Sequence, residues 1–327
     1  MNLRGRKVLI TGGSGFIGSH LTRRLVNEGT DVYVAVKYNS VIDNVRLADV
    51  WDEITPVEID LRNTDSLKSV AEILPDLIYH LAAYNHVGDS FTQVSEAFDS
   101  NGNGTVNLLQ AYEGYERFVY TSTSEVYGYQ ENVPFHEEAH PFPLSPYAVG
   151  KYAGELFARM KWYSANMPVA VIRPFNAFGP YQSARAIIPE IIMKCLRGVD
   201  IATTEGRQTR EFNFVEDLVE GFMLAGTKDA SVGEIINLGC GRETPIRDLV
   251  KLIHSLSGSE SELQIGALPY RPGEIQRMSA NSAKAKALLG WESKQTLEEG
   301  LGRTIDWFRL YLAEFGNADS GLRRLGS

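Results

Sequence analysis

The sequence has few cysteines, no excess of positive charge and no long apolar run. Only two cysteines occur among its 327 residues, Cys195 and Cys240, and their separation excludes a disulfide framework or a cysteine-rich metal knuckle. Lysine and arginine number 32 against 41 aspartates and glutamates, and the resulting net charge of -9 argues against nucleic acid as a partner. No stretch approaches the roughly 18–20 apolar residues of a membrane helix, and no secretory leader precedes the first predicted strand. We therefore expect no membrane partner and a location in a reducing cytoplasm.

Short apolar runs alternate with amphipathic stretches through the first half of the chain. This alternation is typical of an α/β fold with a doubly wound parallel sheet, the Rossmann arrangement. Such a sheet places its ligand crevice at the carboxyl ends of the strands. The predicted strands are Lys7–Thr11, Asp31–Val36, Pro56–Asp60, Asp76–Leu81, Arg117–Thr121 and Val169–Arg173, and the predicted helices between them are Ile17–Glu28, Asp65–Ile73, Glu96–Tyr112 and Tyr147–Asn166.

The pattern of elements changes after about residue 178, where prolines begin to separate shorter segments. We predict that residues 1–178 form the Rossmann domain and that residues 207–243 return to it, adding a strand within Gly233–Gly239. Residues 179–206 and 244–315 are expected to form a smaller, discontinuous α/β cap, and residues 316–327 a tail.

A glycine-rich turn follows the first predicted strand and leads into a helix. Gly12, Gly15 and Gly18 are spaced so that the backbone can turn tightly and approach a pyrophosphate closely. The N-terminus of the helix then offers unpaired N–H groups and a positive dipole end to the phosphates. Because the strand and the helix are both present, the turn predicts dinucleotide binding.

The residue after the second predicted strand bears on the choice of cofactor. NAD enzymes usually carry a carboxylate there for the ribose 2′-hydroxyl, but Lys37 stands at this place. A cation suits a 2′-phosphate, so we favour NADP, with NAD as the alternative. Asp60 and Leu61, after the third strand, are expected beside the adenine. Leu81, Ala82 and Ala83, after the fourth, are expected to pass beside the cofactor.

Tyr147 and Lys151 form a Y-x-x-x-K pair that shares one face of a predicted helix. Ser145 suits the N-cap of that helix and Pro146 its first position. An ammonium near a phenol favours the phenolate, which otherwise forms only near pH 10. A run of hydroxyl side chains, 121–124, follows the fifth strand and could bond a substrate hydroxyl. Y-x-x-x-K alone is common by chance, but its combination with the glycine turn is not.

These motifs resemble the extended short-chain dehydrogenase/reductase family, which modifies nucleotide sugars. The resemblance implies that Tyr147 takes the proton of the sugar C4 hydroxyl while a hydride moves to the nicotinamide. It also implies that Lys151 tunes Tyr147 and binds the ribose, that Thr123 hydrogen-bonds O4, and that the cofactor touches further residues. Those are Phe16, Ile17, Asn39, Ser40 and Pro174. The resemblance covers nearly the whole chain through TGGSGFIGSHL, HLAA, TSTSEVYG, SPYAVGK, RPFNAFGP, REFNFVEDLVEGF, INLG, YRPGE and LLGW.

Glu125 separates the chemistries of this family. A 4,6-dehydratase needs a base for the C5 proton and an acid for the departing C6 hydroxyl, whereas a 4-epimerase needs neither. Related dehydratases supply these roles from a Thr-Asp-Glu run, which maps onto Thr123, Ser124 and Glu125. The resemblance therefore implies that Glu125 exchanges the C5 proton and that Ser124 assists at C6.

Several alternatives to a dehydratase stay open. Serine at position 124 also resembles the GDP-mannose dehydratases and the UDP-glucuronate decarboxylases. A C4-epimerase, a 4-ketoreductase and a dinucleotide-binding regulator without catalysis are further alternatives. The segments 38–40 and 180–189 look like N-acetylhexosamine 4,6-dehydratases of the legionaminic-acid type. A nucleotide-sugar 4,6-dehydratase acting on a UDP-N-acetylhexosamine is thus the favoured interpretation.

The resemblance also implies a substrate site in the cap. Arg210 and Arg271 match the family's phosphate-binding arginines, and a guanidinium fork pairs well with a phosphate. Asn176 matches a residue that touches the sugar or its phosphate, and Arg185 could touch the nucleotide or the sugar. The stretch 136–140 spells the zinc motif H-E-x-x-H, but nearby prolines oppose a helix, so no metal is expected.

A homodimer is a further expectation from the resemblance. In this family the helix that carries Y-x-x-x-K and the long helix before it often pack against a twofold mate as a four-helix bundle. Apolar side chains on both helices would allow this contact, and they would equally serve the core of a monomer. These side chains are Leu108, Leu109, Leu156, Phe157 and Met160.

Overall fold

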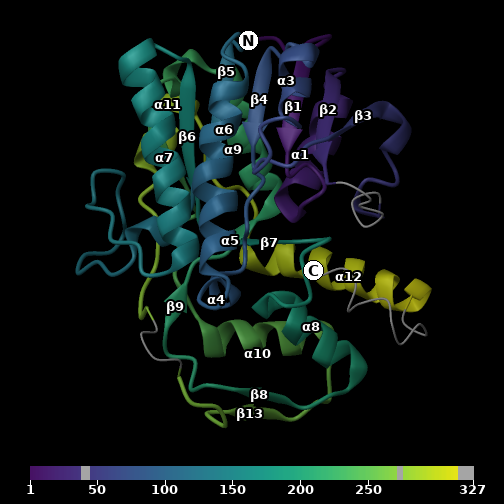
Figure 1. Cartoon of the computed structure of the whole chain (residues 1–327). Coiled ribbons are helices and arrows are strands. Elements are labelled where there is room, and N and C mark those ends of the chain that lie inside the picture. Colours follow the sequence, from purple (N-terminus) through teal and green to yellow (C-terminus); the bar gives the residue numbers. More distant parts are fainter. Residues whose placement is uncertain (38–44, 271–274, 316–327) are drawn as a thin grey trace.

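A seven-stranded parallel sheet forms the centre of the larger part of the molecule (Figure 1). The computed structural model describes residues 1–37, 45–270 and 275–315. The strand order is β11-β6-β5-β4-β1-β2-β3, and every pairing is parallel, which confirms the doubly wound fold. The strands are β1 (Lys7–Thr11), β2 (Asp31–Val36), β3 (Ile54–Glu58), β4 (Leu77–His80), β5 (Arg117–Thr121), β6 (Val169–Pro174) and β11 (Ile235–Leu238).

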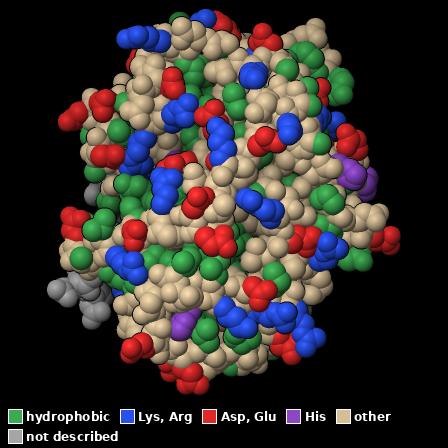
Figure 2. Space-filling model, turned by 180° about the vertical axis from the view of Figure 1, so that it is seen from behind, with side chains coloured by type: hydrophobic (Ala, Val, Ile, Leu, Met, Phe, Trp, Pro, Cys, Tyr) green, Lys and Arg blue, Asp and Glu red, His purple; other side chains and the backbone are tan. Residues whose placement is uncertain are grey.

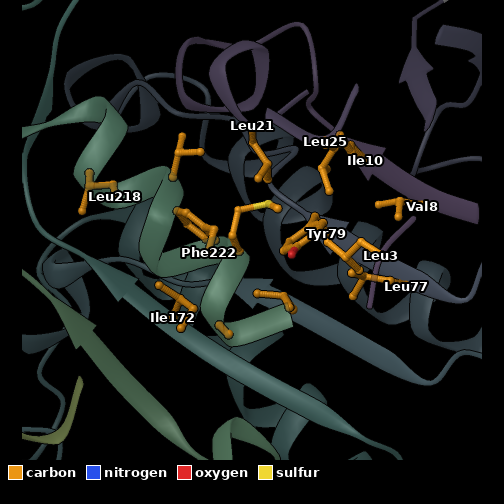
Figure 3. Close-up of a cluster of buried hydrophobic side chains, with 14 of the residues drawn as sticks. Leu3, Val8, Ile10, Leu21, Leu25, Leu77, Tyr79, Ile172, Leu218 and Phe222 are labelled. Carbon is orange, nitrogen blue, oxygen red and sulfur yellow. The ribbon is translucent and has the colours of Figure 1, made fainter. Parts of the chain in front are cut away.

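Helices cover both faces of the sheet, and side chains along each strand alternate between two hydrophobic cores. Val8 and Ile10 of β1 enter one core, part of which is drawn in Figure 3, whereas Leu9 enters the other. The helices over the first core are α1 (Phe16–Asn27), α9 (Val215–Thr227) and α11 (Ala283–Leu289). Those on the second side are α3 (Lys68–Ile73), α6 (Gly104–Ala111) and α7 (Pro146–Ala165).

The predicted helix 96–112 is divided in the structure. It consists of α5 (Val94–Phe98), a π-helical turn η2 (Asp99–Asn103) and α6, and it packs along α7. The short helix α4 (Val87–Ser90) precedes α5. Three single turns of 3-10 helix complete this part: η1 (Trp51–Glu53), η3 (Ser124–Tyr127) and η4 (Asp229–Ser231).

The smaller part of the molecule lies beyond the carboxyl ends of the strands and has its own core (Figure 1). Its helices α8 (Ile187–Arg197), α10 (Ile246–Ser257) and α12 (Leu297–Phe315) pack against one another. Three short strand pairings complete it or join it to the sheet. Their strands are β7 (Ala177–Phe178) with β10 (Asn213–Phe214), β9 (Thr209–Arg210) with β12 (Thr244–Pro245), and β8 (Ile201–Thr203) with β13 (Leu263–Ile265).

Helix α11 lies within the range that the sequence assigns to the cap, yet it packs on the sheet. It contacts β11 and α9, and its Ala285 and Leu289 belong to the core of the sheet. The chain therefore passes between the two parts more often than the predicted boundaries imply.

The surface carries charges of both signs side by side. Figure 2 shows lysine and arginine side chains interspersed with aspartate and glutamate over the rear face. None of the helices in the part of the chain that the structure describes could span a lipid bilayer.

Candidate active site

The glycine turn between β1 and α1 has a geometry that only glycine can adopt. Gly12 has φ +72°, and a Cβ there would lie 2.6 Å from the backbone nitrogen of Ala82. A Cβ at Gly18 would collide with the carbonyl oxygen of Gly12, and one at Gly15 would lie 3.0 Å from the same oxygen. The turn therefore brings bare backbone and the first N–H groups of α1 to one place, as a pyrophosphate requires.

One cavity of about 300 Å³ collects most of the predicted catalytic and cofactor residues. It lies where β1, β4, β5 and β6 end and where α1 and α7 begin. The predicted residues that line it are Gly12, Gly15, Phe16, Ile17, Gly18, Leu81, Ala83, Thr123, Ser124, Glu125, Tyr147, Lys151, Pro174 and Asn176. The sheet thus brings together residues from five separate segments of the chain.

Tyr147 occupies the first turn of α7 and faces the end of β5. As the sequence predicts, Ser145 caps this helix, because its hydroxyl accepts the N–H of Ala148 at 3.1 Å, and Pro146 follows it. Burial raises the pKa of the Tyr147 phenol to about 12, a hydrogen bond with Thr123 opposes this rise, and the charge of Glu125 adds to it. In the protein alone, Tyr147 therefore carries its proton at neutral pH.

Lys151 lies one helical turn further along α7 and is buried. Burial lowers the pKa of its amine to about 7, and the negative charge of Glu155 opposes that change. Its Nζ lies 4.6 Å from the centre of the Tyr120 ring, whose hydroxyl donates to the Lys151 carbonyl at 2.7 Å. Because this pKa lies near neutral pH, a small change in the surroundings of Lys151 changes the charge of its amine.

The segment Thr123–Glu125 turns sharply after β5. Thr123 caps η3, since its hydroxyl accepts the N–H of Glu125 at 3.2 Å. Ser124 is buried, and its hydroxyl donates to the sulfur of Met278 at 3.5 Å. Glu125 is half-buried and lines the cavity. Both residues line the cavity, and Glu125 is the more exposed of the two.

Four predicted cofactor residues lie outside the lining of this cavity. Lys37 is exposed directly after β2, and Asp60 forms an ion pair with Arg62 at 2.9 Å. The carbonyl of Leu61 accepts from Asn107 at 2.9 Å, and the backbone of Ala82 abuts Gly12. They surround the carboxyl ends of β2, β3 and β4, where the far end of an extended dinucleotide would lie.

A second cavity, of about 720 Å³, adjoins the first and extends into the cap. Phe16, Val87, Asn176 and Ala177 line both cavities. The second also contains the predicted substrate residues Arg185 and Arg210 together with the ends of β8 and α8.

Both arginines have partners within the protein. Arg210 donates from Nη1 to the carbonyls of Thr209 and Ile275, at 2.8 and 2.7 Å. Arg185 is exposed and pairs with both oxygens of Asp89, at 2.9 and 3.1 Å, which joins the cap to α4. Asn39, Ser40 and Arg271, together with the segment 38–40, lie outside the described residues.

The sequence did not single out some residues that the structure adds to the site. Asn85, Val87, Phe175 and Ala177 also line the first cavity. Thr121 and Ser122, which belong to the predicted hydroxyl run, line it too. Glu155 was available as a signal, because it follows Lys151 by four positions on a helix.

Comparison with known proteins agrees with this geometry. The sequence profile of the family described as GDP-mannose 4,6 dehydratase matches residues 9–304. A dTDP-D-glucose 4,6-dehydratase from Mus musculus is 32% identical over 336 residues, which cover 97% of this chain and 92% of that protein. UDP-glucuronic acid decarboxylase 1 from Xenopus tropicalis is 35% identical over 324 residues, covering 95% of this chain and 74% of that protein.

Solved structures show the same similarity. An epimerase from Methanothermobacter thermautotrophicus superposes with a TM-score of 0.90 at 31% identity, covering 97% of this chain and 96% of that one. DesIV, a dTDP-glucose 4,6-dehydratase from Streptomyces venezuelae whose structure holds NAD, superposes with a TM-score of 0.87 at 30% identity, covering 94% and 98%. The chain therefore belongs to the extended short-chain dehydrogenase/reductase family of nucleotide-sugar dehydratases, epimerases and decarboxylases.

Proposed function

We propose that the protein is a nucleotide-sugar 4,6-dehydratase and that its substrate is a UDP-N-acetylhexosamine. One observation carries the choice of reaction within the family. The carboxylate of Glu125 lines the same cavity as Thr123, Tyr147 and Lys151. A dehydratase needs such a proton-handling group besides the tyrosine, and a C4-epimerase has no use for it. The choice of sugar rests on the sequence segments 38–40 and 180–189.

The residues of the cavity divide the reaction among them. The phenolate of Tyr147 takes the proton of the C4 hydroxyl, with Thr123 bonded to O4 and the Lys151 ammonium stabilising the phenolate. A nicotinamide cofactor, when bound, accepts the C4 hydride and returns it at C6. The C4 ketone acidifies the C5 proton, which Glu125 removes. The C6–O bond then breaks, and the hydroxyl leaves as water with the proton from Glu125. Once C6 has regained the hydride, C5 takes up a proton from solvent through Glu125, and Tyr147 releases the O4 proton to solvent, which restores both groups.

Glu125 is the group that we assign to both proton transfers. The Ser124 hydroxyl, the other candidate for the C6 acid, is buried against Met278. A carboxylate that has just gained the C5 proton is an acid, so one residue can serve as base and then as acid. Ser124 keeps its proposed role of assisting at C6, next to Glu125.

The sugar nucleotide would extend from the first cavity into the second. We assign its diphosphate to Arg210 and, from the sequence, to Arg271, because a guanidinium pairs bidentately with a phosphate. Asn176 lines both cavities and is placed at their junction, where the sugar meets its phosphate. Arg185 would turn from Asp89 to the nucleotide or the sugar.

We favour NADP as the cofactor, with NAD as the alternative. Lys37 is exposed directly after β2, and Arg46 donates from Nη1 to the carbonyl of Ser14 in the glycine turn at 3.4 Å. Two cations on this side of the turn suit a 2′-phosphate. Titration calorimetry of both nucleotides with the wild type and with Lys37→Ala tests this. A preference for NADP that falls about tenfold in the variant supports it, and tighter binding of NAD by the wild type contradicts it.

We also propose a homodimer in which α5 and α7 meet their copies. Leu156, Met160 and Tyr163 of α7 are exposed, and so is Phe98 of α5. By contrast, Leu108 and Leu109 are fully buried in the core of the same chain and are not available for this contact. Leu156→Glu should shift the sedimentation coefficient to that of a monomer. Leu310→Glu, at an exposed position of α12, is the control, and an unchanged dimer in both variants contradicts the proposal.

The first experiment is a mass spectrum of the products formed in heavy water from a panel of nucleotide sugars. Loss of one water with gain of one deuterium supports the dehydratase and names its substrate. Loss of carbon dioxide from a UDP-glucuronate points to a decarboxylase. A new isomer without loss of mass points to a C4-epimerase, and both of these results overturn the proposed reaction.

A further inference from the structure

A fully buried carboxylate stands behind the active site. Glu155 lies on α7 one turn beyond Lys151, with no exposed surface, and it is not among the residues that line either cavity. It does not touch a sugar or a cofactor in that position. Its part in the site must therefore act through its neighbours.

Three segments of the active site converge on this carboxylate. Glu155 accepts from Nε and Nη2 of Arg173, at 3.0 and 2.5 Å, and from the hydroxyl of Ser122 at 2.6 Å. Ser122 directly precedes Thr123 at the end of β5, and Arg173 directly precedes Pro174 at the end of β6. Glu155 thus ties both strand ends to the helix that carries Tyr147 and Lys151.

The ion pair is costly to bury. Arg173 is 1% exposed and its guanidinium lies 4.7 Å from the centre of the Tyr127 ring, so both charges have left water. Desolvation of two such ions commonly cancels their attraction, and apolar residues of the same volume are often as stable. Overall stability is therefore a poor reason for this network, whereas the fixed orientation of three strand and helix ends is a good one.

We propose that Glu155 is a positioning residue for the reaction: it holds the Thr123 hydroxyl and the Lys151 amine in register with the phenol of Tyr147. Through Ser122 it fixes the turn into Thr123, and through Arg173 it fixes the approach to Pro174. Its own helix carries the two catalytic side chains. This role rests on the proposed use of Tyr147 and Lys151, which dehydration, epimerisation and decarboxylation share.

Glu155 also acts on Lys151 through its charge. Among the described residues, His80 from β4, Tyr120 from β5 and Glu155 from α7 lie near the Lys151 amine. Tyr147 lies one turn earlier on α7 and lines the same cavity, and Arg173 from β6 is paired with Glu155. Burial lowers the pKa of His80 well below its usual value, so this ring is neutral. The negative charge of Glu155 raises the pKa of Lys151 against the stronger effect of burial. Without it, the ammonium would persist only to a lower pH.

The direct test is Glu155→Gln, followed in single turnovers as the absorbance of reduced nicotinamide that forms when C4 is oxidised. We expect kcat for this step to fall at least tenfold, with the KM of the sugar within about twofold, since no contact with the sugar is lost. The pH range over which C4 oxidation is fast should also be narrower in this variant than in the wild type. Earlier loss of the Lys151 ammonium moves the alkaline limb of the profile to lower pH by about one unit.

A second variant keeps the test decisive if Glu155→Gln does not fold. The double variant Glu155→Gln/Arg173→Gln places two amides opposite each other and leaves no buried charge unpaired. We expect the double variant to fold and to show the same narrowed pH profile of C4 oxidation. Ser122→Ala should lower kcat but leave the width of the pH profile unchanged. Asp217→Asn is the control. This buried carboxylate accepts hydrogen bonds from the N–H groups of Lys294 and Gln295, and it lines neither cavity. This substitution should lower the unfolding temperature and leave the profile unchanged.

A folded double variant with the kcat and pH profile of the wild type overturns the positioning role. A failure of the proposed reaction gives a different result. If the wild type oxidises a sugar at C4 without losing water, the dehydratase is wrong and Glu155 can still be tested. If no sugar is oxidised, the inference is tested by the titration of Lys151. NMR of labelled lysine in the cofactor-free protein measures this titration. An equal titration in wild type and double variant then contradicts the inference.

Discussion

The two adjoining cavities differ in how their functional side chains are held. In the first, Tyr147 and Lys151 are fixed by a capped helix and Thr123 by its place after β5. In the second, Arg210 bonds to carbonyls and Arg185 to Asp89, so both arginines hold the protein together before any substrate binds. In the proposed reaction, the catalytic groups are therefore held in place in advance, whereas the arginines proposed to bind the nucleotide would have to exchange their present partners for it. Changes in the first cavity should therefore lower kcat, and changes in the second should raise KM.

Among changes in the first cavity, Tyr147→Phe should lower kcat the most. Because the variant has no phenolate to take the O4 proton, we expect kcat to fall about a thousandfold or more. The cofactor should remain bound, since the ring still fills its place and Lys151 is unchanged. Steady-state kinetics together with calorimetry of the cofactor measure both effects. A variant that keeps the full rate would show that another base removes the proton.

Glu125→Gln should divide the reaction rather than abolish it. The proposed C4 oxidation does not use Glu125, so a burst of reduced nicotinamide should survive. Loss of water should slow by about a hundredfold, because no base removes the C5 proton. Product mass spectra and stopped-flow absorbance separate the two steps. Dehydration at the wild-type rate would remove Glu125 from the mechanism.

Arg210→Ala tests the second cavity. The loss of a charge-assisted contact with the diphosphate should raise KM by about tenfold to a hundredfold, with kcat within about twofold. Arg303→Ala is the matched control, because this exposed arginine pairs with Glu216, lies over the Phe214 ring and lines neither cavity. Initial rates over a range of sugar concentrations give both constants. If kcat fell and KM stayed the same, the division between the two cavities would be wrong.

The pH dependence of stability is the smallest and most specific effect. The pKa of Lys151 is about 7 in the native protein and near 10.5 in the unfolded chain. Between these values the unfolded state binds more protons, so the free energy of unfolding rises with pH through this residue. From pH 7 to 8 the wild type should gain about 1 kcal/mol over Lys151→Met in urea titrations. Parallel curves for the two proteins would mean that Lys151 titrates normally.

Glu211, in another part of the molecule, should make the free energy of unfolding change with pH in the opposite direction. Burial raises its pKa to about 7, although the N–H groups of Ala280 and Gly241 oppose this change. Between pH 4.5 and 7 the native state then holds a proton that the unfolded chain has lost, so its contribution to stability falls as the pH rises. Lys151 and Glu211 thus act in separate pH windows that meet near neutrality.

The sequence predicts the sheet and the first cavity because their signals are local. The bounds of β1, β2 and β5 follow from their apolar runs, and the glycine turn and the Ser145 cap follow from single residues. Contacts between distant segments carry no such signal. The pair Arg185–Asp89, the packing of α11 on β11 and the rotation of Ser124 toward Met278 each depend on where two remote segments meet. The second cavity is made largely of such contacts.

The place of β11 has a consequence for synthesis of the chain on the ribosome. This strand pairs with β6, but it follows β6 only after β7 to β10 and the helices α8 and α9 have been made. Until then, β6 is the open edge of an incomplete sheet, and an unpaired edge invites pairing with other chains. The half-made protein is therefore most exposed to aggregation while residues 175–234 leave the ribosome, and slow translation there would prolong that interval.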